Sequence, residues 1–187
     1  MRLISGKYAR KKIHLPPEAL TRPTSGKVRE AIFNILAHLG EETFRLEEAI
    51  VLDAFAGSGA LGLEALSQGA ARAYFMEKNP SVLKILRHNV FSIASLQEAF
   101  VIGSDALHPK KAKESCSLIF LDPPYGKGFV ETSLQALLNK GWIGEKTILV
   151  IECGYRDVLT LSPSVTILVE KKYGDTRLII GLFSHKP

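Results

Sequence analysis

The alternation of strand-like apolar runs with helical segments constrains the fold of this 187-residue chain more than any other feature. From residue 27 onward, short runs rich in Val, Ile, Leu and Phe are separated by longer segments whose apolar residues recur three and four positions apart. Strands with few polar residues are typical of a parallel sheet that helices cover on both faces. The sequence therefore predicts a doubly wound α/β domain.

The expected elements follow from these patterns and from the residues that bound them. Strands are expected at 49–56, 72–77, 99–105, 117–122 and 146–153, and helices at 27–40, 59–69, 79–93 and 129–141. Two further β-rich runs within 164–184 are joined by the turn-like "KYGDT" (172–176), which predicts an antiparallel C-terminal hairpin. The total is seven strands.

Positive charge is concentrated at the amino terminus. Residues 1–29 carry eight basic side chains and one acidic side chain, a balance of +7, whereas the whole chain has a net charge of +5 and the remainder therefore carries −2. Such a segment is typical of polyanion binders, although a merely solubilising face is the alternative. We expect a basic N-terminal arm or hairpin with linker at 1–26 and the main domain at 27–187. The candidates for nucleic-acid binding are Lys7, Arg10, Lys11, Lys12 and Arg22.

A glycine-rich loop, "VLDAFAGSGALG" (51–62), lies between an expected strand and an expected helix. Its Gly57, Gly59 and Gly62 form a GxGxxG pattern, which suits any nucleotide that needs close backbone approach. Glu77 lies 20 residues after Gly57 at the end of the next strand, where it could bind ribose hydroxyls. To this point a dinucleotide-binding oxidoreductase fits as well.

Acidic residues at successive strand ends favour a positively charged cofactor. Asp53 precedes the first glycine by four residues, where it would repel a pyrophosphate but attract an ammonium or a sulfonium, and S-adenosylmethionine carries both. Asp105 follows the third strand and is a candidate acceptor for an adenine amine. Capping of the following loop or helix is the alternative role of Asp53 and Asp105.

The stretch "LDPPYG" (121–126) ends a buried strand with an acid, two prolines and an aromatic residue. The prolines stop the ladder and stiffen the loop, so that Asp122 and Tyr125 are held at the strand's carboxyl end, where open parallel sheets bind ligands. An exocyclic base amine is a poor nucleophile and needs acceptors to hold its hydrogens. Asp122 and the Pro123 carbonyl can supply these acceptors, and Tyr125 can stack on the base.

Several classes of site and location are disfavoured. Cys116 and Cys153 lie far apart beside apolar runs, which predicts buried free thiols, and the five histidines show no metal-ligand spacing, so no metal is expected. The amino terminus lacks the apolar stretch of a secretory signal, and no apolar run approaches the length of a membrane span. We therefore expect a cytoplasmic protein.

The stretches "TRPTSGKVREAIFNIL", "FMEKN", "LIFLDPPYG" and "KKYGDTRL", together with the glycine-rich loop, resemble the bacterial 16S ribosomal RNA guanine-N2 methyltransferases of the RsmD type over nearly the whole chain. The resemblance implies a class I, Rossmann-like methyltransferase fold, S-adenosylmethionine as donor, and a guanine amine in the assembling small subunit as substrate. It assigns catalysis to Asp122, Pro123, Pro124 and Tyr125. It assigns cofactor contacts to Asp53, Gly57, Gly59, Glu77 and Asp105 and, less directly, to Thr24. Arg22 would border the cofactor or RNA, and Gly26 departs from the polar residue expected after "TRPTS".

Three other functions are left open. A DNA adenine methyltransferase uses a related motif, but the chain has no obvious insertion for reading DNA sequence. An NAD-dependent oxidoreductase would explain the glycines and Glu77 but neither Asp53 nor the Asp122–Tyr125 motif. A non-catalytic RNA-binding assembly factor would explain the basic segment alone. A monomer is the expected oligomeric state.

Overall fold

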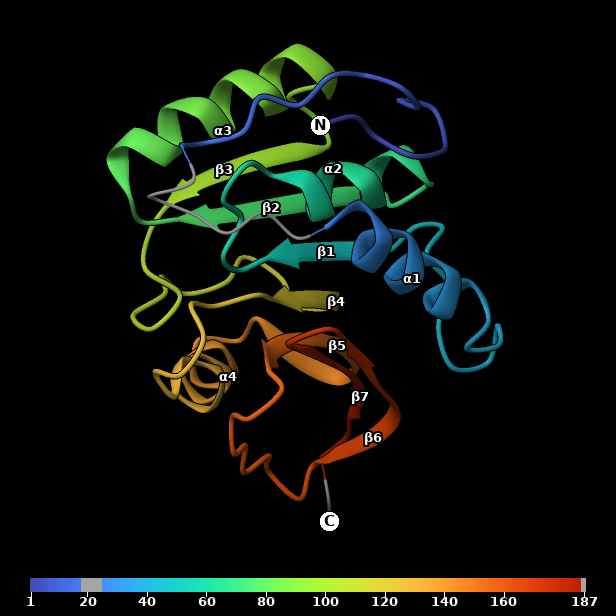
Figure 1. Cartoon of the computed structure of the whole chain (residues 1–187), viewed down its shortest axis with the longest axis vertical. Helices are drawn as coiled ribbons and strands as arrows, with labels where there is room; N and C mark the ends of the chain where they lie inside the picture. The colour runs from blue at the N-terminus through green and yellow to red at the C-terminus, as the bar shows by residue number, and fades with distance from the viewer. Residues whose placement is uncertain (18–24, 186–187) are drawn as a thin grey trace.

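The computed structural model describes residues 1–17 and 25–185, and within them seven strands form one sheet in the order β3-β2-β1-β4-β5-β7-β6 (Figure 1). The strands are β1 (Ile50–Asp53), β2 (Arg72–Glu77), β3 (Ala99–Gly103), β4 (Cys116–Leu121), β5 (Ile143–Gly154), β6 (Val165–Tyr173) and β7 (Thr176–Phe183). The helices are α1 (Gly26–Ala37), α2 (Ala60–Ser67), α3 (Pro80–Ile93) and α4 (Phe129–Asn139).

The direction of the strands determines where a ligand can bind. The five strands β1 to β5 all run parallel to one another. β7 pairs antiparallel with both β5 and β6. From β1 the chain first winds toward β3 and then returns to β4 on the other side of β1, so the order reverses between β1 and β4. In an open α/β sheet, the crevice outside the carboxyl ends of the strands at this reversal is the usual ligand site.

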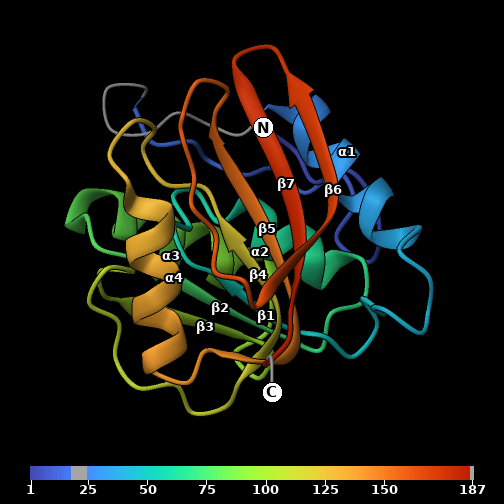
Figure 2. The same ribbon diagram turned by 90° about the horizontal axis from the view of Figure 1, so that it is seen from below.

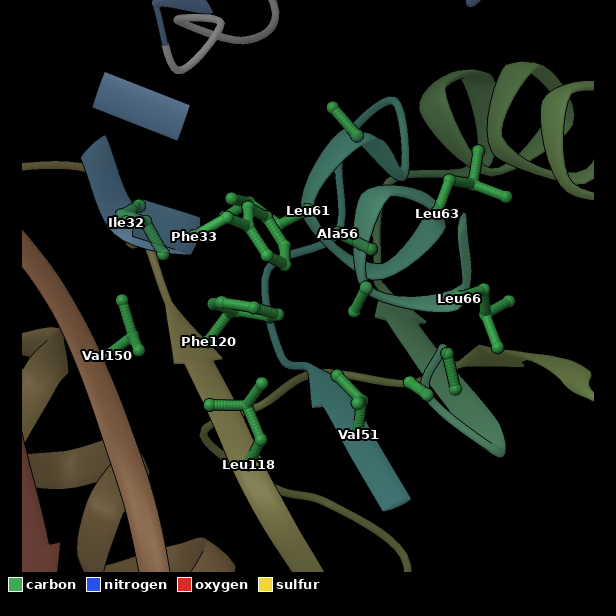
Figure 3. Close-up of a cluster of buried hydrophobic side chains, with 14 of the residues drawn as sticks. Ile32, Phe33, Val51, Ala56, Leu61, Leu63, Leu66, Leu118, Phe120 and Val150 are labelled. Atoms are coloured by element: carbon green, nitrogen blue, oxygen red, sulfur yellow. The ribbon is translucent and has the colours of Figure 1, made fainter. Parts of the chain in front are cut away.

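The helices divide between the two faces of the sheet, and Figure 2 shows α1 and α4 on opposite sides. The face under α1, α2 and α3 carries the larger core cluster, part of which is drawn in Figure 3, where Phe33 of α1 packs against Phe120 of β4. The face under α4 carries a second cluster around Leu137 and Trp142. Burial on both faces explains why the central strands are almost continuously apolar.

The basic amino-terminal segment packs against the main body (Figure 1). It folds back on itself through a bridge between Arg2 and Lys12, and Leu3 and Ile13 are buried in the larger core cluster. Glu64 of α2, which is fully buried, accepts hydrogen bonds from the backbone N–H groups of Ile4 and Ser5. The segment is therefore held by core contacts, while the division at residue 26 stays a prediction.

The predicted doubly wound fold with its antiparallel terminal hairpin is confirmed. Ser25 caps α1 by accepting from the Val28 N–H, and Asn79 caps α3 by accepting from the Ser81 and Val82 N–H groups. Several boundaries differ, and β1 is the clearest case, because it covers Ile50–Asp53 where a strand at 49–56 was expected. Helix α1 ends at Ala37, before Gly40, and β5 begins at Ile143 because an irregular pairing with Cys116 extends it toward its amino end.

Candidate active site

A cavity of about 830 Å³ lies at the carboxyl ends of the parallel strands. Its wall brings together most of the predicted site residues: Asp53, Gly57, Glu77, Asp105, Asp122, Pro123, Pro124 and Tyr125. These residues come from four strand ends and the loops that follow them. The predicted cofactor and substrate groups therefore share one cavity.

Strand periodicity explains why the acids meet there. Side chains two positions apart on a strand share a face of the sheet. The residues two positions before Asp53, Glu77, Asp122 and Glu152 all belong to the larger core cluster, and they are Val51, Phe75, Phe120 and Val150. The alternation of side chains along each strand therefore places all four acids on the same face of the sheet as the larger core cluster, at the carboxyl ends of the strands, where that cluster ends.

Asp53 is the most deeply buried of the acids predicted to contact the cofactor, at 3% exposure. Its Oδ2 accepts a hydrogen bond of 3.1 Å from the Gly62 N–H at the start of α2. Burial raises the pKa of Asp53 to about 7, and the negative charges of the nearby Asp122 and Glu77 raise it further. The hydrogen bond from Gly62 lowers the pKa but does not cancel these effects. A positively charged ligand group beside Asp53 would offset these effects and favour its ionised form.

The glycine-rich loop is held open by backbone conformation and by Glu77. Gly57 has φ +53°, and a Cβ added there would meet only open space apart from the Phe55 carbonyl oxygen at 3.9 Å, so a ligand can approach its backbone. Glu77 accepts from the N–H groups of Gly57 (3.1 Å) and Asn79 (2.7 Å). In this arrangement Glu77 orders the loop while also facing the cavity.

The other two glycines serve packing. Gly59 has φ +83°, and a Cβ on it would lie 2.7 Å from the Leu86 side chain. At Gly62 a Cβ would lie 2.4 Å from the Phe75 ring. The pattern is therefore explained by tight strand-to-helix turning and close helix packing as well as by ligand approach.

Asp105 caps the turn that follows β3 and also lines the cavity. Its Oδ1 accepts from the Leu107 N–H at 3.0 Å, which stabilises the turn after β3, and its Oδ2 lies 3.1 Å from the Lys78 ammonium. Although partial burial opposes the effect, this hydrogen bond and the Lys78 charge hold the pKa of Asp105 below its ordinary value. The carboxylate thus remains an acceptor on the cavity wall.

The Asp122–Tyr125 loop, which follows β4, forms another part of the cavity wall. Pro123 is buried, and the Tyr125 hydroxyl lies 3.2 Å from Thr176 Oγ1 at the start of β7. The next residue is also fixed, because the Gly126 N–H donates to Asp157 Oδ2 at 3.2 Å. Contacts to β7 and to the segment after β5 therefore supplement the rigidity that the prolines supply.

Several wall residues were not predicted. Ser25 and Val28 of α1 line the cavity, as do Leu15 and Pro16 and the whole turn Tyr173–Thr176. Glu152, at the carboxyl end of β5, is 3% exposed and also lines it. A signal for Glu152 was present, since it ends an apolar run as Asp53 and Asp122 do.

The basic candidates lie elsewhere or outside the described residues. Arg22 and Thr24 fall within 18–24, which the structure does not describe. Lys7 is exposed but forms an ion pair of 2.5 Å with Glu98, next to the amino end of β3, and its N–H donates to Ser67 at the end of α2. Lys7 therefore lies at the edge of the sheet remote from the cavity. Arg10, Lys11 and Lys12 follow it on the exposed surface.

The two cysteines lie outside the cavity wall described above. Cys116 and Cys153 are buried free thiols, as predicted, and burial raises the pKa of both. Residues 1–17 and 25–185 hold no group of three or more His, Cys, Asp and Glu side chains arranged for a metal ion. Among the helices of the same ranges, none has the length and apolarity needed to cross a membrane.

The wall chemistry fits a ligand that combines a cation with a polar ring system. A buried carboxylate is available for the cation, open backbone at Gly57 permits close approach, and acceptors at Glu77 and Asp105 can take hydroxyl or amine hydrogens. The Asp122–Tyr125 loop then faces the same space with an acceptor and an aromatic ring.

Comparison with known proteins yields consistent matches. A family model described as "Conserved hypothetical protein 95" matches residues 1–181. The Ribosomal RNA small subunit methyltransferase D of Escherichia coli K12 is 33% identical over 165 residues, which are 88% of this chain and 80% of that protein. A solved structure described as a putative methyltransferase from Escherichia coli superposes with a TM-score of 0.83 at 30% identity, covering 100% of this chain and 99% of the other.

A more distant structure supports the fold alone. The RNA methyltransferase of Salinibacter ruber, solved in complex with S-adenosyl-L-homocysteine, has a TM-score of 0.64 at 14% identity and covers 89% of this chain and 96% of its own. With the mixed seven-stranded sheet, these similarities identify the class I S-adenosylmethionine-dependent methyltransferase fold.

Proposed function

The chain belongs to the "Conserved hypothetical protein 95" family, and from that membership we propose that it methylates the exocyclic N2 amine of a guanine in small-subunit (16S) ribosomal RNA. The donor in this proposal is S-adenosylmethionine. One observation carries it: the rigid Asp122–Tyr125 loop and the Asp53–Gly57 segment line the same cavity. The name and the 33% identity of the Escherichia coli relative support the choice of ribosomal RNA.

Four residues would hold the cofactor, which supplies a methyl group on a positively charged sulfur. Asp53 would take its ammonium group, and the Gly57 backbone would permit close approach. Glu77 would accept from the ribose hydroxyls and Asp105 from the adenine amine. The raised pKa of Asp53 suits this role because a bound cation favours the carboxylate form.

The chain's own residues would then activate the guanine amine. Because the lone pair of N2 is delocalised into the ring, Asp122 and the Pro123 carbonyl would hold the amine hydrogens so that N2 faces the methyl carbon, while Tyr125 stacks on the base. As N2 bonds to the methyl carbon, the carbon–sulfur bond breaks with its electron pair left on sulfur. The positive charge that develops on N2 is stabilised by Asp122, which accepts the departing proton.

The substrate would be RNA whose target base has left its helix or loop, since the cavity cannot admit an intact duplex. Assembling small subunits, which lie in the cytoplasm, are the source we propose. The exposed Arg10, Lys11 and Lys12 would add contacts to phosphates away from the cavity.

The test is to incubate the protein with labelled donor and separate pools of small-subunit particles, naked ribosomal RNA and DNA. We expect the label to appear in a ribosomal RNA pool, and we expect mass spectrometry to identify the labelled nucleoside as N2-methylguanosine. Methylation of adenine in the DNA pool alone would instead support the DNA methyltransferase alternative. Thermal stabilisation by NAD and none by S-adenosylhomocysteine would support an oxidoreductase.

A further inference from the structure

Glu152 is a buried carboxylate on the cavity wall that the proposed cofactor contacts do not use. It lies in β5, is 3% exposed, and sits on the side of the cavity shared with Asp122 and Tyr125 rather than with the glycine-rich loop. Its place beside the Asp122–Tyr125 loop, on the wall of the same cavity, points to a role toward the substrate.

The sheet register places Glu152 beside Asp122. Leu121, the last residue of β4, pairs with Ile151 of β5 in a parallel ladder. Asp122 directly follows Leu121, and Glu152 directly follows Ile151. Neighbours in register on parallel strands share a face, and adjacent strands are about 4.8 Å apart. Two carboxylates thus lie side by side, in line with the face that α1 covers.

Two carboxylates on adjacent strands can converge on one edge of guanine. On its Watson–Crick edge, guanine presents the N2 amine next to the N1–H, which are two neighbouring hydrogen-bond donors. Adenine has a hydrogen-bond acceptor at N1, as does 2-aminopurine, which keeps the amine at position 2. A carboxylate facing N1 would accept from guanine and would repel the lone pair of the other two bases.

We propose that Glu152 selects guanine by accepting a hydrogen bond from its N1–H while Asp122 holds the neighbouring N2 amine. This inference rests on the proposed function and adds a specificity residue to it. Glu152 lies against the base and takes no part in the transfer of the methyl group. The phosphate contacts and the cofactor contacts are independent of it.

The experiment compares two RNA substrates that differ at the methylated position, once mass analysis has located it. One carries guanosine there and the other carries 2-aminopurine riboside. We expect the wild-type protein to prefer guanosine by roughly 10- to 100-fold in kcat/KM, as for the discrimination that a good base-edge contact provides. In Glu152→Gln, the amide can donate to N1 of 2-aminopurine, so the preference should fall to near unity or reverse.

Two controls separate specificity from structure. Glu114→Gln changes a carboxylate that bonds Tyr74 and Arg72, away from the cavity, and it should leave the preference unchanged. Calorimetric affinity for S-adenosylhomocysteine should be the same in wild type and Glu152→Gln, which also reports that the variant is folded.

The outcomes distinguish the two proposals. A wild-type protein that methylates guanosine and 2-aminopurine equally overturns the role of Glu152 without any variant, as does a Glu152→Gln protein that keeps the full preference. In both cases methylation of guanine still supports the proposed function. If no RNA guanine is methylated at all, both proposals are wrong.

Discussion

The acids at the strand ends differ in their surroundings, and these surroundings determine what each can do. Glu77 accepts from two backbone N–H groups, Asp105 is held by Leu107 and Lys78, and Asp53 is buried with a raised pKa. Asp122 instead begins the proline-stiffened loop. Carboxylates at neighbouring strand ends thus brace loops at Glu77 and Asp105, and we propose ligand binding for Asp53 and substrate orientation for Asp122.

Asp122→Asn should slow methyl transfer while preserving cofactor binding. The amide is similar in shape but accepts less strongly and cannot take the proton that leaves N2, so we expect kcat to fall by about 10²- to 10³-fold. Single-turnover transfer and S-adenosylhomocysteine calorimetry measure the two effects separately. Near wild-type turnover in this variant would rule out the role of Asp122 as acceptor.

Cofactor binding should weaken as the pH falls through about 7. The pKa of Asp53 is raised above its ordinary value in the unliganded protein, so the group is protonated below about 7 and must lose a proton to bind a cation. The dissociation constant for S-adenosylmethionine should therefore rise up to about tenfold per pH unit below 7 and level off above it.

The matched variant for this titration is Asp53→Asn, which keeps the acceptor for the Gly62 N–H but carries no charge. It should bind more weakly at high pH and show a flat profile. Because the raised pKa means that the folded state binds this proton more tightly, the unliganded wild type should also lose stability relative to Asp53→Asn as the pH rises from about 4 to about 7. Parallel pH profiles for the two proteins would contradict the assignment.

At the scale of elements, the packing of α2 on β2 depends on the absence of a side chain at Gly62. A Cβ there would lie 2.4 Å from the Phe75 ring, which is fully buried, so Gly62→Ala should reduce the free energy of unfolding by about 1–3 kcal/mol. Gly26→Ala is the matched control, since Gly26 also begins a helix but a Cβ on it would meet nothing within 4 Å. Urea denaturation compares them, and equal stability of both variants would be inconsistent with the packing described.

The sequence predicted these elements well because their determinants are local. Asn79 with Pro80 marks the start of α3, and apolar runs followed by an acid mark the ends of β1, β2 and β4. The docking of the amino-terminal segment could not be predicted in this way. Glu64 lies within an apolar helix. Besides the nearby Gln68, its partners are Ile4 and Ser5, some 60 residues away, and Arg29 at 3.4 Å.

The candidate site shows the same limit. Asp53, Gly57 and the Asp122–Tyr125 loop were predicted because each combines an unusual residue with a strand end. Glu152 also ends an apolar run, but neither a GxGxxG pattern nor a proline pair follows it, so the sequence did not single it out. The β4–β5 register places it beside Asp122. The contribution of Tyr173–Thr176 likewise depends on how the terminal hairpin folds over the cavity.

At the scale of the whole molecule, the basic amino-terminal segment runs between the two ends of the parallel strands. Lys7, whose charge is balanced by Glu98, lies near the amino end of β3, whereas Leu15 and Pro16 of the same segment line the cavity at the carboxyl ends. The exposed Arg10, Lys11 and Lys12 lie between Lys7 and Leu15 in the sequence. An RNA that fills the cavity and also contacts these three residues must extend over this segment. This arrangement suits a large folded substrate better than a free nucleoside.

Replacing Arg10, Lys11 and Lys12 with Ala should weaken RNA binding and reduce the salt dependence of the affinity. If all three contact phosphates, the slope of log K against log salt should become shallower by about 2. The control replaces Lys110, Lys111 and Lys113, which removes the same charge from an exposed loop before β4. An unchanged slope in the first variant would exclude this surface from the RNA interface.

The central claim is that the cavity at the carboxyl edge is where methyl transfer occurs, and a crystal structure with S-adenosylhomocysteine tests it most directly. We predict that the ligand's ammonium group lies beside Asp53 and that its sulfur faces the Asp122–Tyr125 loop, with space for a base between them. A ligand bound elsewhere, or one whose sulfur is turned away from Asp122, would contradict the account.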